Sequence, residues 1–421
     1  MTNTLIYLTG RENEHLPLFL HLSDSLNSYI ISPKPGDLTA PYIRKRGEKI
    51  IFLDDLPAGK NPPPVPKEVI AKGLKYISPV SFGTTIKQAL FYKIFSEYWY
   101  VSLKEKLWAR QLFCDYYNKF IRLLEKKHIS KIIVWRHFLL VPIRALSLAA
   151  QTKNIPVLYI YNGLFAHTMC VQDREDITSL TNIRNTRTFY RRYNQKDAIQ
   201  LLRFMKTYHP SLEPQPKAMS VRNLRGKYHI PNGKKIIFVP MQMPPLLPKS
   251  SIYIKDEEEF MNYIVTSCED EKGFFFVFKL HPNCERILSS RSGNQIIFKN
   301  ANVRDLIELS DLVVTIGSGA GLEALLFHKK VLCLGDAVYS GMGFTIDLDD
   351  LINLKMAIKQ ALQTPSSEKY STNFLRFVYE LYFNFYFPYC VYPNKNMETE
   401  MDQILERIKE FSCETNVGDE G

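Results

Sequence analysis

The sequence lacks an uninterrupted apolar run of the roughly 18 residues that a membrane-spanning helix requires. Its seven cysteines are scattered and odd in number, and none of them forms a C-x-x-C pair. A zinc site or a disulfide framework is therefore not expected, and a reducing cytoplasm is the simplest compartment. The N-terminus turns polar after a short apolar run, which predicts a first strand and not a signal peptide. Any membrane association is expected to be peripheral.

The sequence also lacks short-period repeats and low-complexity tracts, so its 421 residues are expected to form two or three domains. Hydrophobic residues make up 45% and charged residues 23%, which excludes a mostly disordered chain. Lys and Arg number 54 against 43 Asp and Glu, a formal net charge of +11, and 24 Tyr and 26 Phe accompany them. The positive charge favours a polyanionic partner: nucleic acid, an anionic membrane surface or a phosphorylated substrate.

Short β-rich runs alternate with helical segments in the first half of the chain. The helical segment runs from Ile86 to about Lys127, with apolar residues at three- and four-residue spacings and no proline. Apolar runs without alternation fit strands buried on both faces of a parallel sheet. The predicted strands are 4–8, 28–31, 49–53, 131–135 and 156–161.

A second alternating set follows a polar, proline-bearing passage, His209–Lys235, which is the best linker candidate. Its predicted strands are 236–240, 274–280, 296–299, 312–316 and 331–334, and its predicted helices are 257–268, 303–309 and 322–328. The pattern predicts an α/β protein with two Rossmann-like domains facing a cleft. The predicted boundaries are an N-terminal α/β domain at 1–209, a linker at 210–233, a C-terminal α/β domain at 234–365 and a helical tail at 366–421.

The tail is dense in aromatic residues between Tyr370 and Tyr392, and a final helix is expected from about Asn396 to Phe411. The favoured interpretation is helices that brace both domains, with the aromatic rings as core. The alternative is an aromatic, partly basic surface that sits on lipid headgroups, where tyrosine combines an apolar body with a polar tip.

Two local motifs indicate phosphate chemistry in the second half. In DLVVTIGSGAGLE (311–323), an apolar strand leads through Gly317, Ser318, Gly319 and Gly321 into a helix. Glycines allow a ligand to approach the backbone, and a helix N-terminus offers N–H groups to a phosphate. Glu323, in the first helical turn, could accept hydrogen bonds from a ribose diol; alternatively it only favours the helix dipole.

The second motif is FFFVFKLHP (274–282), a strand that brings Lys279, His281 and Pro282 to its carboxyl end. An ammonium group and an imidazole there could both contact a phosphate ester. A lone His281 would more simply be a solvent-facing loop residue. The phosphate interpretation depends on finding both motifs in one Rossmann-like half.

The sequence here resembles a known family. KLHP (279–282) followed by residues 302–345 resembles the capsule polysaccharide biosynthesis family of β-Kdo transferases. That family shows, in order, a K-x-H-P element, an N…LI…AD…V-x-S-x-x-G-x-E-A-L element and a G…Y…G-x-T element. The resemblance spans about Ile132 to Thr345, and Tyr161–Leu164 and FVPMQ (238–242) match in outline.

The resemblance implies a GT-B-like fold in which the C-terminal half holds a CMP-activated Kdo donor and the acceptor is a lipid or a growing glycan. No cofactor is expected beyond this donor substrate, and no metal, because no metal-binding cluster is apparent in the sequence. The nucleotide-binding residues would be Lys279, His281, Pro282, Gly317, Ser318, Gly319, Gly321 and Glu323. The implied location is the inner face of the cytoplasmic membrane, with other capsule-assembly proteins as possible partners.

Two departures concern catalysis. The family places a Glu where this chain has Tyr161, and an Asp shortly after the position of Gln242, where this chain has no carboxylate until Asp256. Retaining glycosyl transfer through a covalent intermediate needs a carboxylate nucleophile and a general acid/base. Three explanations stay open: the local alignment is shifted, other carboxylates such as Asp173, Glu175 or Asp176 substitute, or the chemistry differs. The catalytic candidates are Asp173, Tyr161 and Gln242, and a catalytically silent binding partner is the alternative function.

The segment RNTRTFYRRYNQK (184–196) mixes cationic and aromatic residues, a combination that could track phosphates and stack bases. Neither a compact nucleic-acid-binding module nor a long basic stripe accompanies it. A solvated helix face is the simpler interpretation, a contact with an acceptor phosphate or anionic lipid comes second, and nucleic acid is not an expected partner.

Overall fold

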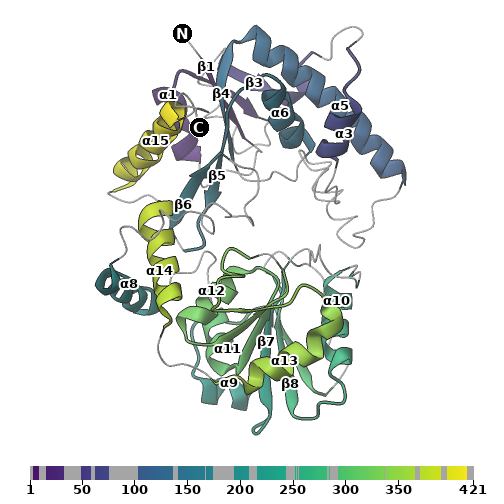
Figure 1. Ribbon diagram of the computed structural model, residues 1–421, viewed down its shortest axis with the longest axis vertical. Coiled ribbons are helices and arrows are strands. Elements are labelled where there is room, and N and C mark those ends of the chain that lie inside the picture. Colours follow the sequence, from purple (N-terminus) through teal and green to yellow (C-terminus); the bar gives the residue numbers. More distant parts are fainter. Residues whose placement is uncertain are drawn as a thin grey trace, which may run out of the picture. The chain divides into compact units, whose positions relative to one another are not determined.

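The structure of the protein is a computed structural model (Figure 1). It describes residues 3–8, 16–32, 49–57, 62–74, 103–135, 141–165, 167–173, 194–207, 216–242, 252, 254, 256–281, 284, 293–335, 337–365, 370–389 and 396–414. The chain forms two compact units. The first contains Met1–Gly163, His167–Asp176 and Tyr386–Gly421, and the second contains Leu164–Ala166 and Ile177–Phe385.

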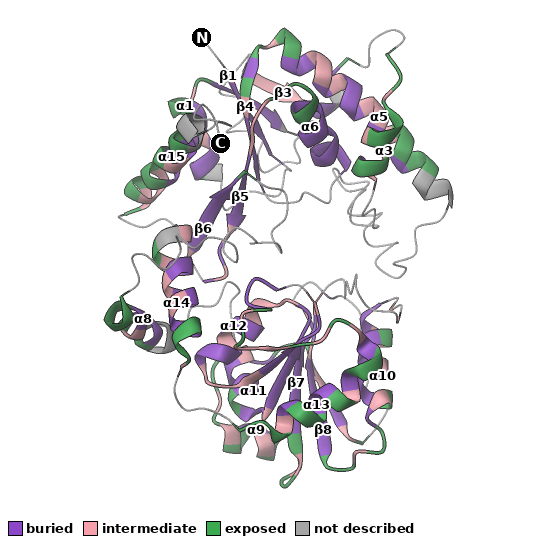
Figure 2. Cartoon of the chain, viewed as in Figure 1, coloured by how far each residue is buried: buried purple, intermediate pink, exposed green. Residues whose placement is uncertain are grey.

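The first unit is built on a seven-stranded sheet with the order β13-β6-β5-β4-β1-β2-β3. Its strands are β1 (Asn3–Tyr7), β2 (Ser28–Ser32), β3 (Ile50–Phe52), β4 (Ile129–Trp135), β5 (Val157–Asn162), β6 (Thr168–Gln172) and β13 (Phe387–Pro388). Strands β1 to β5 pair in parallel, and β6 and β13 are added antiparallel at one edge. The central, mainly apolar strands β1, β4, β5 and β6 are buried (Figure 2), as expected of a sheet covered on both faces, and the edge strand β3 is half-buried.

Helices cover both faces of this sheet. They are α1 (Leu16–Ser25), α3 (Lys67–Gly73), α5 (Leu103–Lys126), α6 (Val141–Thr152) and α15 (Met397–Glu414). On one face, Phe19 of α1 meets Trp135 of β4 edge to face, and Ile404 and Ile408 of α15 join the same cluster. On the other face α5 packs against α6, and the Phe120 ring meets Tyr7 of β1.

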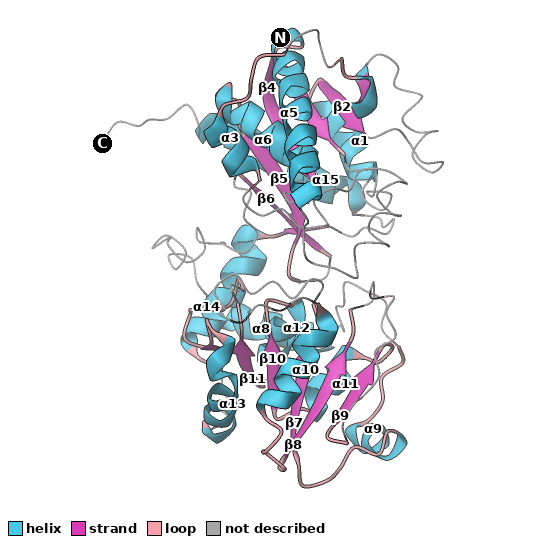
Figure 3. Ribbon diagram, turned by 90° about the vertical axis from the view of Figure 1, so that its right-hand side faces the viewer, coloured by secondary structure: helices cyan, strands magenta, loops and turns pink. Residues whose placement is uncertain are grey.

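The second unit has a six-stranded, all-parallel sheet with the order β12-β11-β10-β7-β8-β9 (Figure 3). Its strands are β7 (Lys235–Pro240), β8 (Phe274–Lys279), β9 (Gln295–Phe298), β10 (Leu312–Thr315), β11 (Lys330–Cys333) and β12 (Ile346–Asp347). The first strand in sequence therefore lies in the middle of the sheet, and the chain builds outward from it in both directions, as in a doubly wound Rossmann fold.

The helices of the second unit are α8 (Gln195–Thr207), α9 (Val221–Lys227), α10 (Glu257–Ser267), α11 (Val303–Leu309), α12 (Gly319–Leu326), α13 (Leu354–Gln363) and α14 (Thr372–Glu380), and some of them cover the two faces of its sheet. Helices α10 and α13 bury Phe260, Ile264, Leu354 and Ile358 against one face. Helices α11 and α12 pack against each other and on strands β7, β10 and β11.

The predicted α/β class with two Rossmann-like halves is confirmed. The ten predicted strands all occur, because their apolar runs are the buried strands of the two sheets. Helix α11 has the predicted bounds, and the part of the predicted helix after Ile86 that the structure describes is α5. The cleft between the two domains stays a prediction.

The passage predicted as a linker at 210–233 is, from residue 216 onward, a packed part of the second unit. The Met219 N–H donates to the buried carboxylate of Asp305 at 2.7 Å, and the Asn302 amide donates to the Pro216 carbonyl at 3.0 Å. Ser220 caps the short helix α9, which packs on α11. The second unit also includes α8, which was assigned to the N-terminal domain, because α8 packs against α14.

The C-terminal tail contributes one helix to each unit. Helix α14 buries Phe374 and Phe377 in the second unit, where both rings contact Phe344. Helix α15 packs against α1 in the first unit. Phe374, Phe377, Tyr386 and Tyr389 are core residues, as the favoured interpretation expected, but the other aromatic residues of the described tail are only half-buried and Phe383 keeps 48% of its surface exposed.

The packing of the predicted linker can be tested at Asp305. An Asp305→Ala variant leaves the Met219 N–H without its carboxylate partner, and we expect the second unit to lose about 1–3 kcal/mol of stability. Cleavage within 216–230 by a protease should accelerate. The control is Glu308→Ala on the exposed side of the same helix, which should change stability by less than about 0.5 kcal/mol. Equal protease resistance of the two variants would contradict the packing.

Candidate functional site

The second sheet defines one place where a ligand is expected. Strand β7 pairs with β8 on one side and with β10 on the other, and the connections from β7 and β10 lead in opposite directions along the sheet. In open α/β sheets, the carboxyl ends of two such strands border a crevice that binds ligands. The residues that follow β7, β8 and β10 are therefore the candidate site.

Strand register brings the predicted residues to this edge. Pro240 is paired with Lys279 in the β7–β8 ladder, and Phe238 with Val313 in the β7–β10 ladder. If both registers are continued past the ends of the strands, Gln242, His281 and Gly317 lie opposite one another across the sheet, at its carboxyl edge. Three segments that are far apart in the sequence therefore meet at one end of the sheet, as parallel pairing requires.

Helix α12 begins at this edge with a well-formed N-cap. The Ser318 Oγ accepts from the Ala320 N–H at 3.3 Å, and Ser318 itself has an extended backbone. The Ser318 N–H donates to Thr315 Oγ1 at 3.1 Å, and its carbonyl accepts from Gly321 and from the Tyr339 hydroxyl. This geometry ends β10, starts α12 and directs the first N–H groups of the helix to the carboxyl edge.

The two glycines of the first turn of α12 have different surroundings. A Cβ atom built on Gly319 would meet nothing within 4 Å, so this position is open. A Cβ atom on Gly321 would lie 2.7 Å from Tyr339 Cζ and 2.9 Å from Thr315 Cγ2. Gly321 is therefore required by packing inside the protein, and Gly319 is the position that leaves space for a ligand.

Glu323 lies one turn further along α12 and faces a buried cation. Its Oε1 is 4.0 Å from Nε of Arg304 on α11, and the Arg304 guanidinium also lies over the Phe327 ring. Burial raises the pKa of Glu323 to about 7, and the Arg304 charge opposes that shift. A ribose contact by Glu323 stays a prediction; the contact that the structure gives it is with Arg304.

The other predicted nucleotide contacts lie at the end of β8. Lys279 is the last residue of this strand, His281 follows it, and both side chains are half-buried. Pro282 lies outside the described residues. Gln242, which follows β7, has a buried side-chain oxygen that accepts no hydrogen bond from the residues that the structure describes. An amide oxygen in this state at the edge of a crevice suits a ligand with a hydrogen-bond donor.

The remaining catalytic candidates belong to the first unit. Tyr161 is on β5, is 1% exposed and stacks on Tyr159, so its ring is part of the core. Asp173 follows β6 and is exposed. Glu175 and Asp176 lie outside the described residues, as do positions 184–193 of the basic segment. In the second unit, Asp256 is the N-cap of α10, where its carboxylate accepts from the Glu259 N–H at 2.9 Å.

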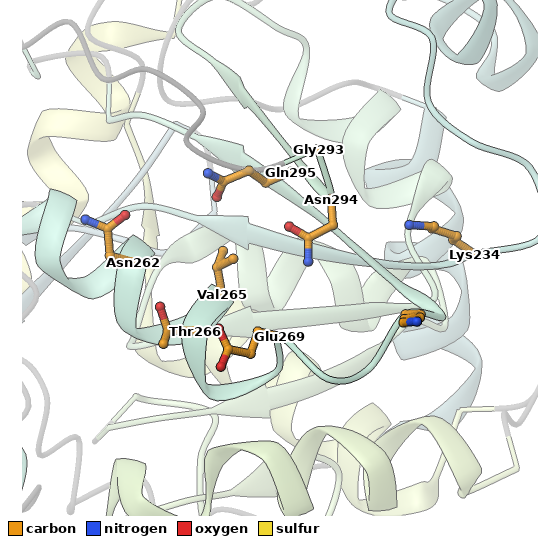
Figure 4. Close-up of a pocket in the computed structure, with 9 residues that line it drawn as sticks. Lys234, Asn262, Val265, Thr266, Glu269, Gly293, Asn294 and Gln295 are labelled. Atoms are coloured by element: carbon orange, nitrogen blue, oxygen red, sulfur yellow. The ribbon is translucent and has the colours of Figure 1, made fainter.

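A large pocket lies at the opposite end of the second sheet (Figure 4). It has a volume of about 840 Å³, and its walls come from the residues before β7, β8 and β9 and from the second half of α10. Side chains of Lys234, Asn262, Glu269 and Asn294 are among those that line it. Because it lies at the amino ends of the strands, it is separate from the candidate site.

Two further searches cover the described residues only. Among them, no group of three or more His, Cys, Asp or Glu side chains is arranged to hold a metal ion. Within the same residues, no helix has both the length and the hydropathy needed to cross a bilayer.

Comparison with known proteins identifies this part of the chain. Residues 283–388, which include β10, α12 and Tyr339, match the family model of the capsule polysaccharide biosynthesis protein. The family model covers only this stretch of the chain. The resemblance to this family that the sequence predicted is therefore confirmed over residues 283–388, which hold the start of α12.

The chain is also similar to individual proteins. It is 27% identical to Protein FixF of Sinorhizobium fredii over 241 residues, which are 56% of either chain, so the alignment spans about half the length of that relative. Distant structural likenesses are the β-Kdo 2,4 and 2,7 transferases of Thermosulfurimonas dismutans KpsC, both 16% identical, with TM-scores of 0.44 and 0.39. These likenesses cover 66% and 69% of this chain and 88% and 89% of those chains.

Sequence reasoning missed Tyr339 and Arg304 as parts of the site. Tyr339 was visible only as the Tyr of the G…Y…G-x-T element, and nothing in that pattern indicated that its hydroxyl reaches Ser318. Arg304 is the second residue of a predicted helix and has no motif of its own. Both roles depend on contacts between residues distant in sequence: Tyr339 contacts the backbone carbonyl of Ser318, and Arg304 contacts the carboxylate of Glu323.

The two glycines of α12 give a matched test of the local packing. Gly321→Ala should cost about 1–3 kcal/mol of stability, because its Cβ overlaps the buried Tyr339 ring. Gly319→Ala should leave stability unchanged or raise it by up to about 1 kcal/mol, because alanine favours helix. Urea unfolding of both variants measures the difference, and equal effects would contradict the packing described.

Glu323 predicts a pH-dependent stability. The folded state keeps its proton up to about pH 7, whereas an unperturbed Glu releases it near 4.5, so the folded state binds more protons between these values. Stability contributed by the neutral form is therefore lost as the pH rises through about 7. Relative to wild type, Glu323→Gln should gain on the order of 2 kcal/mol between pH 5 and pH 8.

Urea unfolding at several pH values measures this gain. The exposed Glu308→Gln serves as the control, and its stability relative to wild type should not change with pH in the same way. A Glu323→Gln offset that stays constant from pH 5 to pH 8 would contradict the raised pKa.

Proposed function

We propose that the protein is a glycosyltransferase of capsule or surface polysaccharide biosynthesis. In this proposal it transfers Kdo, or a related sugar, from a CMP-activated donor to a lipid or glycan acceptor. The observation behind the proposal is the Ser318-capped start of α12 at the switch point of a Rossmann-like sheet, within the stretch that matches the capsule family.

The start of α12 offers a site for the donor phosphate. The Gly319 N–H has no intrahelical partner and donates to no acceptor among the residues that the structure describes. Space is open above Gly319, and the helix N-terminus adds a partial positive charge. Lys279 and His281 end the neighbouring part of the same sheet edge and would add cationic or donor groups to a phosphate.

These groups suit the bond that the reaction breaks. In transfer from a CMP-sugar, the bond between the anomeric carbon and a phosphate oxygen breaks, and the phosphate gains negative charge as CMP departs. Donors fixed before the reaction stabilise that charge without reorganisation. The acceptor hydroxyl forms the new bond and gives up its proton to a base, for which Asp173 is a candidate. Gln242 would hydrogen-bond the donor through its buried amide oxygen.

The acceptor side of the proposal depends on charge. The net charge of +11 favours an anionic acceptor or an anionic lipid surface. We place the protein at the inner face of the cytoplasmic membrane, bound peripherally, where other capsule-assembly proteins could be partners. Binding to vesicles should then rise with their content of anionic lipid.

A second function is favoured because the carboxylates that the resemblance calls for are missing at the matching positions. Tyr161 stands where the resemblance calls for a Glu and is buried in the core, and Asp256 is already the N-cap of α10. A catalytically silent protein that binds nucleotide or glycan would fit this arrangement. A turnover assay with CMP-Kdo and a lipid acceptor separates the two, because product above background eliminates the silent protein. A screen of other donors covers transfer of a different group.

Ser318 gives the direct test of the nucleotide site. We expect CMP to bind wild type and to slow hydrogen exchange at 315–322, and Ser318→Ala to weaken CMP binding about tenfold through loss of a donor and of the helix cap. The matched control is Ser371→Ala, which removes the serine cap of α14 instead. Calorimetry measures the affinities. Wild-type exchange unchanged at saturating CMP, with Ser318→Ala binding as well as wild type, would refute the site.

A further inference from the structure

Helix α12 is held at both ends by tyrosine hydroxyls from later parts of the chain. The Tyr339 hydroxyl donates to the carbonyl of Ser318, the N-cap residue, at 2.6 Å. The Tyr370 hydroxyl donates to the carbonyl of Leu326, the last residue of the helix. Only the first of these contacts lies at the end where the phosphate is proposed to bind.

Tyr339 is itself rigidly placed. It is fully buried, and its hydroxyl and ring occupy the space that a side chain at position 321 would need. The loop after it is fixed by Asp347, whose carboxylate accepts from the Gly341 N–H at 2.9 Å and from Thr345 Oγ1 at 2.8 Å. A hydroxyl held in this way determines where the Ser318 carbonyl can lie.

The Ser318 backbone is thereby fixed on both sides of its Cα atom. Its N–H donates to Thr315 Oγ1 at the buried end of β10, and its carbonyl accepts from Tyr339. Two bonds in opposite directions along the chain define the peptide planes before and after Ser318. The second of these planes contains the Gly319 N–H, the group proposed to meet the phosphate.

We propose that Tyr339 is a positioning residue for the phosphate site: its hydroxyl orients the Ser318–Gly319 peptide so that the Gly319 N–H faces the ligand. This inference rests on the proposed nucleotide site. Burial also raises the pKa of Tyr339 well above its usual value, so the hydroxyl remains a donor at physiological pH.

The test compares Tyr339→Phe with Tyr370→Phe. Each change removes one hydroxyl that donates to a carbonyl of the same helix, so both variants should lose a comparable amount of stability. We expect Tyr339→Phe to weaken CMP binding by about threefold to tenfold and Tyr370→Phe to change it by less than about twofold. Equal effects on CMP affinity, or none from Tyr339→Phe, would overturn the positioning role.

Hydrogen exchange without nucleotide separates this inference from the proposed function. Tyr339→Phe should speed exchange of the amides of 318–321, and Tyr370→Phe should instead speed exchange at 327–329. If wild type fails to bind CMP but this exchange pattern appears, the donor proposal is wrong and the positioning role stands. If the amides of 318–321 exchange at the wild-type rate in Tyr339→Phe, the positioning role is wrong whatever the ligand.

Discussion

The way the chain leaves β10 is the constraint on which the candidate site depends. Between Thr315 and Gly319 the backbone changes from a buried strand to a helix, and it does so with its polar groups bound on both sides of Ser318. That turn allows no Cβ at position 321, because the Tyr339 ring fills the space. The glycines of the GSGAG segment are therefore required for two separate reasons. Gly321 is required by internal packing, and Gly319 leaves access for a ligand.

Parallel pairing of the strands brings the other residues of the candidate site together. Because β7, β8 and β10 run in one direction and in register, the residues after them meet at one edge although they are distant in sequence. The same pairing forms the large pocket at the opposite edge, where the sheet has no switch point. The large pocket and the candidate site thus lie at opposite ends of the sheet, and the strand order identifies the carboxyl end as the one expected to bind a ligand.

Much of this fold is visible in the sequence, because strands buried on both faces appear as short apolar runs that neighbouring helices separate. The passage before β7 misled the prediction for a physical reason. Its prolines and polar residues are typical of a linker, but the acceptor that fixes it, Asp305, lies 86 residues away from Met219. The role of Tyr339 was hidden in a similar way, since its partner is a backbone carbonyl 21 residues earlier. A pattern of residue types in the sequence does not show which side chains hydrogen-bond to distant backbone groups.

The division of the chain also has a consequence for the order of folding. Residues 177–385 lie between segments of the first unit, which takes β13 and α15 from after Phe385. During synthesis, the second unit has all its strands before the first unit receives α15, which together with α1 covers one face of its sheet. We therefore expect strands β1 to β6, which are synthesised first, to keep apolar surface exposed to chaperones until α15 has left the ribosome and packs on them. The candidate site, whose segments all lie within residues 177–385 of the second unit, does not have to wait.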